Sequence, residues 1–405
     1  MTSAAPFALV ISASERTLRK VRALGLRIVH IEDPSMAVPS SAEFCDRSVV
    51  SDLADVPAVL AMAQQLDREY GFAAVLTNHE PAVVPAQVIS DALGLRSSGV
   101  GSLLRDKAAL RAALDGTPLG VPWEVVRHRD DVAAFIGEHG FPVILKPTTG
   151  SASVGVVVVR GPSGVAAAWV EAMTVVEHGH RFSEVLPVDT YMVERFFEGA
   201  EYSVETLSID GAHGVLAVVE KTTSPGRVEL GHTVPPARLE LARRRAIEQT
   251  VVEFLTLIGF RDGAAHTEVI DGLGSVVIIE SHARTGGDGI PALVAAVIGR
   301  DVELEMLAVL SGSIPGPATA ASADAISKRF LTARTGRVTR LTGVVEARTM
   351  PGVIAVELDI EVGDDVHDPD ASWWRVGEVV AVGATPEIAV ERACRAAGHI
   401  EIEVI

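Results

Sequence analysis

The chain has 405 residues, of which 48% are hydrophobic and 22% are charged, so it is long enough for two or three globular domains and is not a disordered protein. Its formal net charge of −18 opposes a broad electrostatic contact with nucleic acid or with an anionic membrane. This charge does not exclude nucleotide binding, which uses local lysines and backbone N–H groups.

The first hundred residues alternate predicted strands and helices. The predicted strands are Phe7–Ile11, Arg27–Ile31, Ser48–Val50 and Phe72–Leu76, and the predicted helices are Glu15–Leu24, Val56–Tyr70 and one that begins at Pro81. Strands separated by helices predict a parallel sheet with covered faces. Thr77, Asn78, His79 and Glu80 follow the last of these strands, at the edge where α/β sheets bind ligands.

From Leu104 onward the pattern changes to strands that follow one another. We expect an amphipathic helix at Leu104–Leu114 and a second long helix near Arg238–Ile258. The predicted strands are Phe141–Lys146, Val154–Val159, Tyr191–Glu194, Glu201–Ile209, Gly214–Lys221, Ala264–Ile270 and Ser275–Glu280. This order is typical of an α+β domain built on a mostly antiparallel sheet.

The segment Pro317–Ala325 is rich in Ala, Ser and Thr and is interpreted as a linker. After it we expect short strands, a helix at Glu387–Ala397 and a last strand at Ile400–Ile405. The fold class is therefore α/β combined with α+β.

The two cysteines, Cys45 and Cys394, have no metal or redox spacing, and a reducing cytoplasm is the expected location. The first residues lack the basic and apolar regions of a signal peptide, and no stretch is apolar enough to span a bilayer. We therefore expect no membrane partner and no nucleic-acid partner.

The most informative segment is a β-branched run that ends on Glu280 and continues through His282 and Arg284 into glycines. A second carboxylate, Glu268, lies on the preceding predicted strand, and the turn Asp271–Gly274 makes the two strands a hairpin. Both carboxylates can then point to one place, where they would bind Mg²⁺ together with phosphate oxygens and water. The alternative is a pair of exposed turn ends joined by an Arg–Glu bridge, but the glycines after Arg284 favour a bulky ligand against the backbone.

A second motif surrounds Lys146, which ends a predicted strand and precedes the small-residue loop Thr148–Ser153. Small residues allow the backbone to approach anionic oxygens, the hydroxyls of Ser151 and Ser153 can donate hydrogen bonds, and the lysine adds positive charge. The spacing is not that of a Walker loop. The alternative is an ordinary hairpin with a lysine at its rim.

Two further segments carry charged groups between strands. Glu194 and Glu201 flank Phe196 and Phe197, a pattern that offers an apolar slot for adenine and a carboxylate acceptor for ribose, although a Glu-rich surface hairpin is the alternative. Lys221 ends an apolar strand and is followed by a Gly/Pro loop, Glu229 and His232. A solvent-exposed lysine and a structural histidine are the alternatives there.

Taken in order, these motifs resemble the ATP-grasp superfamily over roughly residues 1–310, with a C-terminal extension. Within it, Glu229–His232, His266–Glu268 and Glu280–Arg284 are most similar to L-amino acid ligases, which join a carboxylate to an amine. The resemblance implies an N-terminal α/β domain (1–100), an ATP-grasp subdomain with the lysines and phosphate loop (101–190), a subdomain with the hinge and metal site (191–316), and a C-terminal α+β extension (317–405).

The resemblance also implies a role for each motif residue. The residues expected to contact ATP are Lys107, Lys146, Ser151, Ser153, Glu194, Phe196, Phe197, Glu201 and Lys221. Glu268 and Glu280 would bind Mg²⁺, with two ions expected and Mn²⁺ as an alternative metal, and Arg284 would stabilise the acyl phosphate and the tetrahedral intermediate. Glu229 and His232 would lie near the amino end of a substrate, with His232 a candidate base. Many superfamily members carry Asn where this chain has His282, and this departure leaves the metal-ligand role of His282 open.

We therefore expect an ATP-dependent carboxylate–amine ligase that forms an amide through an acyl phosphate and releases ADP and phosphate. The expected substrates are amino acids, and the resemblance suggests a homodimer. Two alternatives remain open: an ATP-grasp ligase or carboxylase that acts on a non-amino-acid carboxylate, and a non-catalytic nucleotide-binding protein with the same fold.

Overall fold

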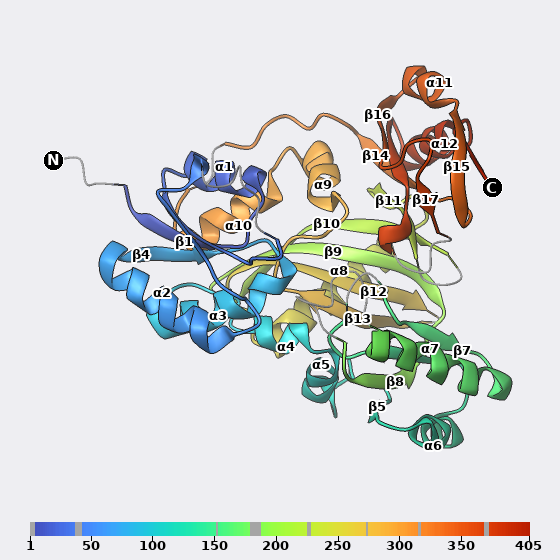
Figure 1. Cartoon of the computed structure of the whole chain (residues 1–405), viewed down its shortest axis with the longest axis horizontal. Coiled ribbons are helices and arrows are strands. Elements are labelled where there is room, and N and C mark those ends of the chain that lie inside the picture. The colour runs from blue at the N-terminus through green and yellow to red at the C-terminus, as the bar shows by residue number, and fades with distance from the viewer. Residues whose placement is uncertain are drawn as a thin grey trace.

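The computed structural model describes residues 5–36, 43–150, 153–178, 188–224, 228–272, 274–314, 317–367 and 372–405. Figure 1 shows an N-terminal α/β part, a long central sheet, a small α+β part beside one end of that sheet, and a C-terminal part that extends it. The predicted phosphate-loop residue Ser151 lies outside the described ranges. Within these ranges, no helix is both long enough and apolar enough to cross a membrane.

The N-terminal part is the predicted parallel sheet. Its strands β1 (Phe7–Ile11), β2 (Arg27–Glu32), β3 (Arg47–Val50) and β4 (Phe72–Leu76) lie in the order β3-β2-β1-β4, and every neighbouring pair is parallel. The helices of this part are α1 (Glu15–Ala23), α2 (Val56–Tyr70) and α3 (Val83–Leu93). Ala8 to Ile11 of β1 are fully buried, as expected for a central parallel strand with both faces covered.

A small sheet forms the lower right of Figure 1, in the order β5-β8-β6-β7. Its strands are β5 (Trp123–Val126), β6 (Val143–Pro147), β7 (Val157–Val159) and β8 (Tyr191–Arg195), and all of its pairings are antiparallel. The hairpin predicted around Lys146 is thus β6 and β7. Two helices that were not predicted, α6 (Arg129–His139) and α7 (Val165–His178), share a hydrophobic core with this sheet.

The central sheet has the order β13-β12-β9-β10-β11-β14-β18-β16. Its first five strands are β13 (Val276–His282), β12 (Gly263–Gly272), β9 (Gly199–Ile209), β10 (Ala212–Thr223) and β11 (Glu229–Val234). All are paired antiparallel, as predicted, and helix α8 (Leu241–Leu257) contributes Ile247, Val251 and Phe254 to the core beneath them. Strand β11 was not predicted.

The C-terminal part continues this same sheet, because β14 (Ala325–Leu331) pairs with β11 and is followed by β18 (Gly377–Gly383) and β16 (Val353–Leu358). The contact is close: a Cβ added at Gly231 of β11 would lie 2.5 Å from the carbonyl oxygen of Lys328. The remaining elements are α11 (Val344–Thr349), α12 (Pro386–Ala397), the short helix η4 (Ser372–Trp374), and a small sheet of β17 (Asp365–Val366), β15 (Gly336–Thr342) and β19 (Glu401–Val404).

The helix predicted at Leu104–Leu114 is in fact two helices, α4 (Gly101–Arg105) and α5 (Lys107–Leu114). Asp106 interrupts it because its backbone is extended and its carboxylate accepts hydrogen bonds from the N–H groups of Ala108 and Ala109. This is the geometry of an N-cap, which an aspartate favours over a position within a helix. The break makes Lys107 the first residue of α5.

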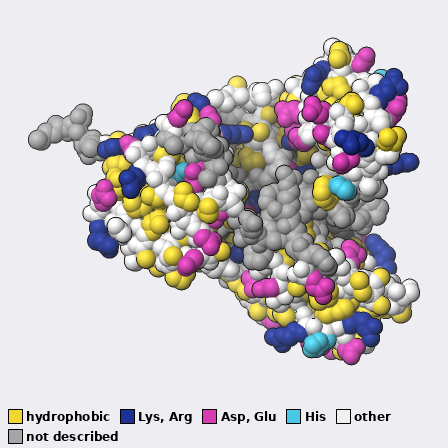
Figure 2. Space-filling view, viewed as in Figure 1, with side chains coloured by type: hydrophobic (Ala, Val, Ile, Leu, Met, Phe, Trp, Pro, Cys, Tyr) yellow, Lys and Arg dark blue, Asp and Glu magenta, His cyan; other side chains and the backbone are white. Residues whose placement is uncertain are grey.

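The N-terminal part is joined to the rest of the chain through α10 (Val302–Ser311), which packs on β4 and follows α9 (Ile290–Ile298). Glu303 of α10 is buried and accepts hydrogen bonds from Thr17 Oγ1 at 2.6 Å and Lys20 Nζ at 2.7 Å. These contacts fix α1, and with it the parallel sheet, against the central sheet. On the face seen in Figure 2, lysine and arginine side chains are interspersed with acidic ones.

Candidate active site

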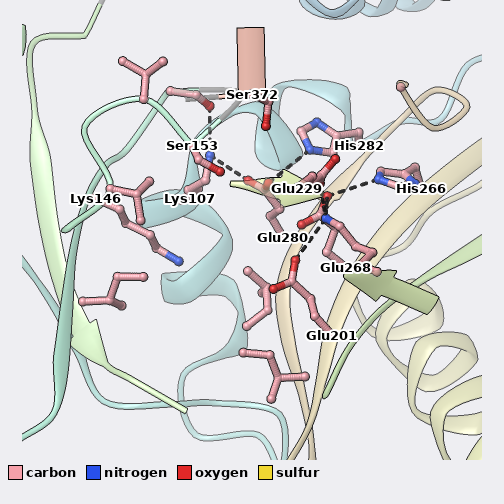
Figure 3. A pocket seen from close by; sticks show the side chains of 18 of the residues that line it. Lys107, Lys146, Ser153, Glu201, Glu229, His266, Glu268, Glu280, His282 and Ser372 are labelled. Atoms are coloured by element: carbon pink, nitrogen blue, oxygen red, sulfur yellow. Dashed lines mark hydrogen bonds and ion pairs between the residues drawn. The ribbon is translucent and has the colours of Figure 1, made fainter. Parts of the chain in front are cut away.

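A cavity of about 410 Å³ lies where the four parts of the chain meet (Figure 3). Its walls come from the small sheet, the central sheet, Glu80 of the N-terminal part, and Ser372 and Arg375 of the C-terminal part. The predicted site residues that line it are Lys107, Lys146, Ser153, Glu194, Phe196, Phe197, Glu201, Lys221, Glu229, Glu268, Glu280, His282 and Arg284. Motifs spread over almost 180 residues of sequence are thus brought to one place.

Glu268 and Glu280 are direct partners across β12 and β13, which form the predicted hairpin. Residues that face each other in an antiparallel pair have Cβ atoms only about 5 Å apart, so two carboxylates there repel unless cations compensate them. The compensating groups are Lys107, whose Nζ lies 2.8 Å from Glu280 Oε2, and Lys221, whose Nζ lies 2.8 Å from Glu268 Oε1. Although burial opposes ionisation, Lys221 lowers the pKa of Glu268 to about 2.

Lys221 lies at the centre of three carboxylates. Its Nζ is 2.5 Å from Glu229 Oε1 and 3.1 Å from Glu201 Oε1, in addition to its contact with Glu268, and its side chain is only 1% exposed. Burial alone would lower the pKa of this lysine, but the three carboxylates raise it well above its ordinary value. Lys221 is therefore not the solvent-exposed lysine that the sequence left open as an alternative.

Lys146 and Glu194 form a buried ion pair on neighbouring strands of the small sheet. Lys146 Nζ lies 2.5 Å from Glu194 Oε1, and Arg111 Nε donates to Glu194 Oε2 at 2.7 Å. Burial lowers the pKa of Lys146 to about 8, while Arg111 and Lys146 outweigh burial and lower the pKa of Glu194 to about 2. The Glu194 carboxylate is committed to two cations, and its predicted contact with ATP stays a prediction.

Arg111 is a residue that the sequence did not single out. It is 1% exposed, although it is one of the largest side chains of the molecule, and its Nη1 and Nη2 donate to the backbone carbonyls of Ile278 and Ile279 on β13. Arg111 thereby ties the small sheet, through Glu194, to the strand that carries Glu280. The sequence did not indicate that Arg111 is buried, because an arginine in a helix is usually exposed to solvent.

Lys107 joins the β6–β7 hairpin to the central sheet. Its backbone N–H donates to Thr148 O at 2.8 Å, and its Nζ donates to Gly150 O at 3.0 Å while contacting Glu280. Ser153 lies in the same hairpin with a positive φ of 61°, a conformation that non-glycine residues rarely adopt. The hairpin and the first turn of α5 therefore form one wall of the pocket (Figure 3).

The end of β13 is held by the N-terminal part. Glu80 Oε2 accepts a hydrogen bond from Arg284 Nε at 2.5 Å and lies 3.1 Å from His282 Nδ1, and Asn78 Oδ1 accepts from Thr285 Oγ1 at 2.9 Å. Of the polar residues predicted at the carboxyl end of β4, Glu80 lines the pocket and Asn78 contacts the loop after β13, whereas Thr77 and His79 do not line the pocket. His282 contacts Glu80 and lies 3.7 Å from Glu280, and its proposed role as a metal ligand stays a prediction.

His266 lies behind Glu268 on the same face of β12. Its Nδ1 is 2.5 Å from Glu205 Oε1, and its Nε2 is 3.2 Å from Glu268 Oε1. Burial opposes protonation of this imidazole, but Glu205 and Glu268 raise the pKa of His266 to about 10. Glu205 also accepts the backbone N–H of Gly286 at 3.2 Å, so His266 and Glu205 connect the carboxylate pair to the glycine loop after Arg284.

His232 is fully buried and does not line the cavity. Its Nε2 lies 3.5 Å from Glu229 Oε2 and 3.6 Å from Asp288 Oδ2, both of which do line it. Direct contact of His232 with a substrate stays a prediction. His232 lies outside the cavity and next to Glu229 and Asp288, whose carboxylates line it.

Oxygen donors suitable for a divalent cation are concentrated around Glu268. Carboxylate oxygens of Glu201, Glu229 and Glu268 lie within 4.8 Å of one another, and Glu280 faces Glu268 directly. A hard cation such as Mg²⁺ prefers oxygen ligands of this kind. In this structure Lys221 contacts Glu201, Glu229 and Glu268, and Lys107 contacts Glu280, so a metal held by Glu268 and Glu280 would replace these lysine contacts.

Two family models match separate parts of the chain. Residues 139–292 match the ATP-grasp domain, and residues 329–404 match L-amino acid ligase C-terminal domain 2. The L-amino acid ligase from Bacillus licheniformis has a similar structure, with a TM-score of 0.80 and 21% identity over 100% of both chains, a similarity that establishes the fold.

The curated relatives that match the chain include two ligases named for alanine substrates. Alanine–anticapsin ligase of Bacillus subtilis is 27% identical over 253 residues, which are 58% of this chain and 53% of the relative. D-Alanine–D-alanine ligase of Geotalea uraniireducens is 27% identical over 268 residues, covering 58% of this chain and 81% of the relative. The chain spans about half the length of the first of these relatives.

The chain has the ATP-grasp fold, as the sequence predicted, and residues 139–292 match the ATP-grasp domain. Residues 329–404 match L-amino acid ligase C-terminal domain 2, so this part of the chain is similar to that group of ligases.

The buried Lys146–Glu194–Arg111 cluster predicts a large effect on stability. Replacing Glu194 with alanine leaves two buried cations without their partner, which typically costs about 3–5 kcal/mol. We expect Glu194→Ala to lower the free energy of unfolding, measured by urea denaturation, by that amount. The matched control is Glu198→Ala, which removes an exposed partner of Arg160 and should change stability by less than about 0.5 kcal/mol. Equal losses of unfolding free energy in the two variants would contradict the role of Glu194 as the partner of two buried cations.

Proposed function

We propose that this protein is an ATP-dependent ligase that joins the carboxylate of one amino acid to the amine of another through an acyl phosphate. The observation that carries the proposal is the direct pairing of Glu268 with Glu280 in a pocket that also holds Lys107, Lys146 and Arg284. This set combines metal-binding oxygens with three cations for a phosphate chain and an acyl group. The named relatives that join amino acids support the choice of substrates.

The nucleotide would bind between the small sheet and the central sheet. Ile144, Val156, Phe196, Ile270 and Ile279 line that side of the cavity and suit the apolar faces of adenine. The backbone at Phe196 and Phe197 would meet the edge of the base, Glu201 would accept hydrogen bonds from the ribose, and Lys221 would lie beside the nucleotide. Lys107, Lys146 and the hairpin that holds Ser151 and Ser153 would contact the phosphates.

Glu268 and Glu280 would hold Mg²⁺, for which we propose two ions. The metal would neutralise charge on the transferred phosphoryl group. Glu194 would position Lys146, and Lys107 would move from Glu280 toward the phosphates when the metal takes over that carboxylate. In ATP-grasp ligases generally, ATP and a divalent metal are the shared requirements.

The acyl transfer would take place beside Arg284. Attack of the substrate carboxylate on the γ-phosphate of ATP gives an acyl phosphate and ADP, and attack of the amine on the acyl carbon then releases phosphate. Negative charge develops on the acyl oxygen, and an arginine held in place by Glu80 stabilises it without reorganisation. Glu229 would hold the amino end of a substrate, with His232 behind it, and we propose a cytoplasmic homodimer as the working form.

The proposal is tested by measuring ADP release with single amino acids and with pairs, together with mass spectrometry of the products. We expect turnover that requires two amino acids, or a larger amount of one, and a product of dipeptide mass. Turnover that depends instead on bicarbonate or on a non-amino-acid carboxylate would overturn the amino acid assignment. ADP binding without turnover on any carboxylate would favour a non-catalytic nucleotide-binding protein.

Removal of a proposed metal ligand should abolish turnover. Glu280→Ala is expected to lower kcat for ADP release by at least about a hundredfold, because phosphoryl charge is no longer neutralised. Chelation of divalent metal by EDTA should have the same effect on the unchanged protein. Glu346→Ala, an exposed position on α11, is the control and should keep normal turnover. Near-normal turnover of Glu280→Ala would exclude Glu280 as a metal ligand.

The lowered pKa of Lys146 predicts how nucleotide affinity changes with pH. Burial lowers this pKa to about 8, so the lysine is mostly charged at pH 7 and mostly neutral at pH 9. A phosphate binds the charged form, and the Kd for Mg-ADP should therefore rise by up to about tenfold between pH 7 and pH 9. Isothermal titration calorimetry at each pH would measure this Kd. In Lys146→Arg the guanidinium stays charged over this range, and the pH dependence should flatten. If the Kd of Lys146→Arg still rises steeply with pH, a group other than Lys146 causes the pH dependence.

A further inference from the structure

One end of the pocket is built by the C-terminal part of the chain. Arg375, which follows the short helix η4, reaches the loop after β13 and makes two hydrogen bonds to Asp288, from Nη1 to Oδ2 at 2.8 Å and from Nη2 to Oδ1 at 2.6 Å. Both side chains line the cavity, as does the buried Ser372. Neither Arg375 nor Asp288 carried a signal in the sequence.

The arginine of this pair is restrained on two sides. Its guanidinium carbon lies 3.7 Å from the ring centroid of Phe330 on β14, while its edge is fixed by the bidentate contact with Asp288. Stacking on an aromatic ring and a two-point contact with a carboxylate are the interactions that orient guanidinium groups best. Since the Arg375 side chain is also only 12% exposed, the pair forms a preorganised end wall.

The end wall lies close to the proposed site for the substrate amino group. One donor atom each of Glu229, His232 and Asp288 lie within 4.8 Å of one another. This cluster is not a vacant cation site, because Lys221 contacts Glu229 at 2.5 Å and Arg375 neutralises Asp288. A metal ion there would have to displace Arg375. Arg375 Nη1 also lies 3.9 Å from Glu229 Oε2, so an amino acid held through its ammonium group at Glu229 would lie beside Arg375 and Asp288.

We propose that Arg375, through its ion pair with Asp288, determines which amino acid side chain is accepted at this end of the pocket. The inference rests on the proposed function and names its substrate class: amino acids with small or polar side chains. A small side chain does not reach the ion pair, and a hydroxyl or amide can form hydrogen bonds with its charged groups. A large apolar side chain would cover these charged groups without forming hydrogen bonds to them, which penalises its binding.

The test is a competition among amino acids, with each supplied as one of two substrates and the products identified by mass spectrometry. For the unchanged protein we expect kcat/KM to favour alanine, serine and glutamine over leucine and phenylalanine. The double variant Asp288→Ala with Arg375→Met replaces the ion pair by two apolar side chains. It should raise the ratio of kcat/KM for leucine to that for serine by at least about tenfold.

Two controls make the outcome specific to the pocket. Arg395→Met removes an arginine of the same domain whose side chain is 48% exposed and lies outside the cavity, and it should leave the preference order as it was. The Kd for Mg-ADP reports whether the double variant still folds. If that variant does not fold, Asp288→Asn keeps the shape of the wall while weakening the ion pair, and it should shift the same ratio in the same direction by about threefold.

The possible failures are distinguishable. If the unchanged protein releases no ADP with any amino acids, the proposed function fails and the inference fails with it. If the unchanged protein forms dipeptides but the folded variants keep its order of preference, the proposed function stands and the role of Arg375 is overturned. A preference of the unchanged protein for large apolar side chains at this end would also overturn it.

Discussion

The arrangement of the site depends on one electrostatic constraint, the direct pairing of Glu268 and Glu280 across an antiparallel hairpin. Two partly buried carboxylates at directly opposite positions destabilise a sheet unless positive charge is placed beside them. Lys221 and Lys107 supply that charge from a neighbouring strand and from the first turn of a helix. A pair of carboxylates that must be neutralised is a natural place for a divalent metal, and the lysines then become available for other anions.

The need to neutralise charge in the pocket also connects parts of the chain that are far apart in the sequence. Lys107 brings the small sheet and its hairpin to β13, Glu80 brings the N-terminal part to Arg284, and Arg375 brings the C-terminal part to Asp288. Each of these ion pairs spans two structural parts, and each lies in the wall of one cavity. The charges that would serve catalysis therefore also hold the parts together around the pocket.

The sequence predicted local structure wherever a pattern was strong. The alternation of buried strands with helices predicted the parallel sheet around β1, and the Asp271–Gly274 turn predicted the hairpin that places Glu268 opposite Glu280. The prediction failed where one residue or a weak pattern decided the outcome. Asp106 divides a helix that the amphipathic pattern made continuous, because an N-cap carboxylate satisfies backbone N–H groups better than a position inside the helix does. Helix α6 was missed altogether, because its apolar residues form one unbroken run, Val132–Ile136, that shows no helical periodicity in the sequence.

What the sequence by itself determined is the fold class and the identity of most groups in the pocket, since strand periodicity, turn residues and the order of the motifs are local properties. What only the tertiary structure decided is which group neutralises which. Arg111 meets Glu194 across 83 residues and Arg284 meets Glu80 across 204, and neither pairing leaves a trace in the sequence nearby. Such pairings are selected when packed elements remove charges from water, because a buried charge must then find its partner within reach, whatever the distance along the chain.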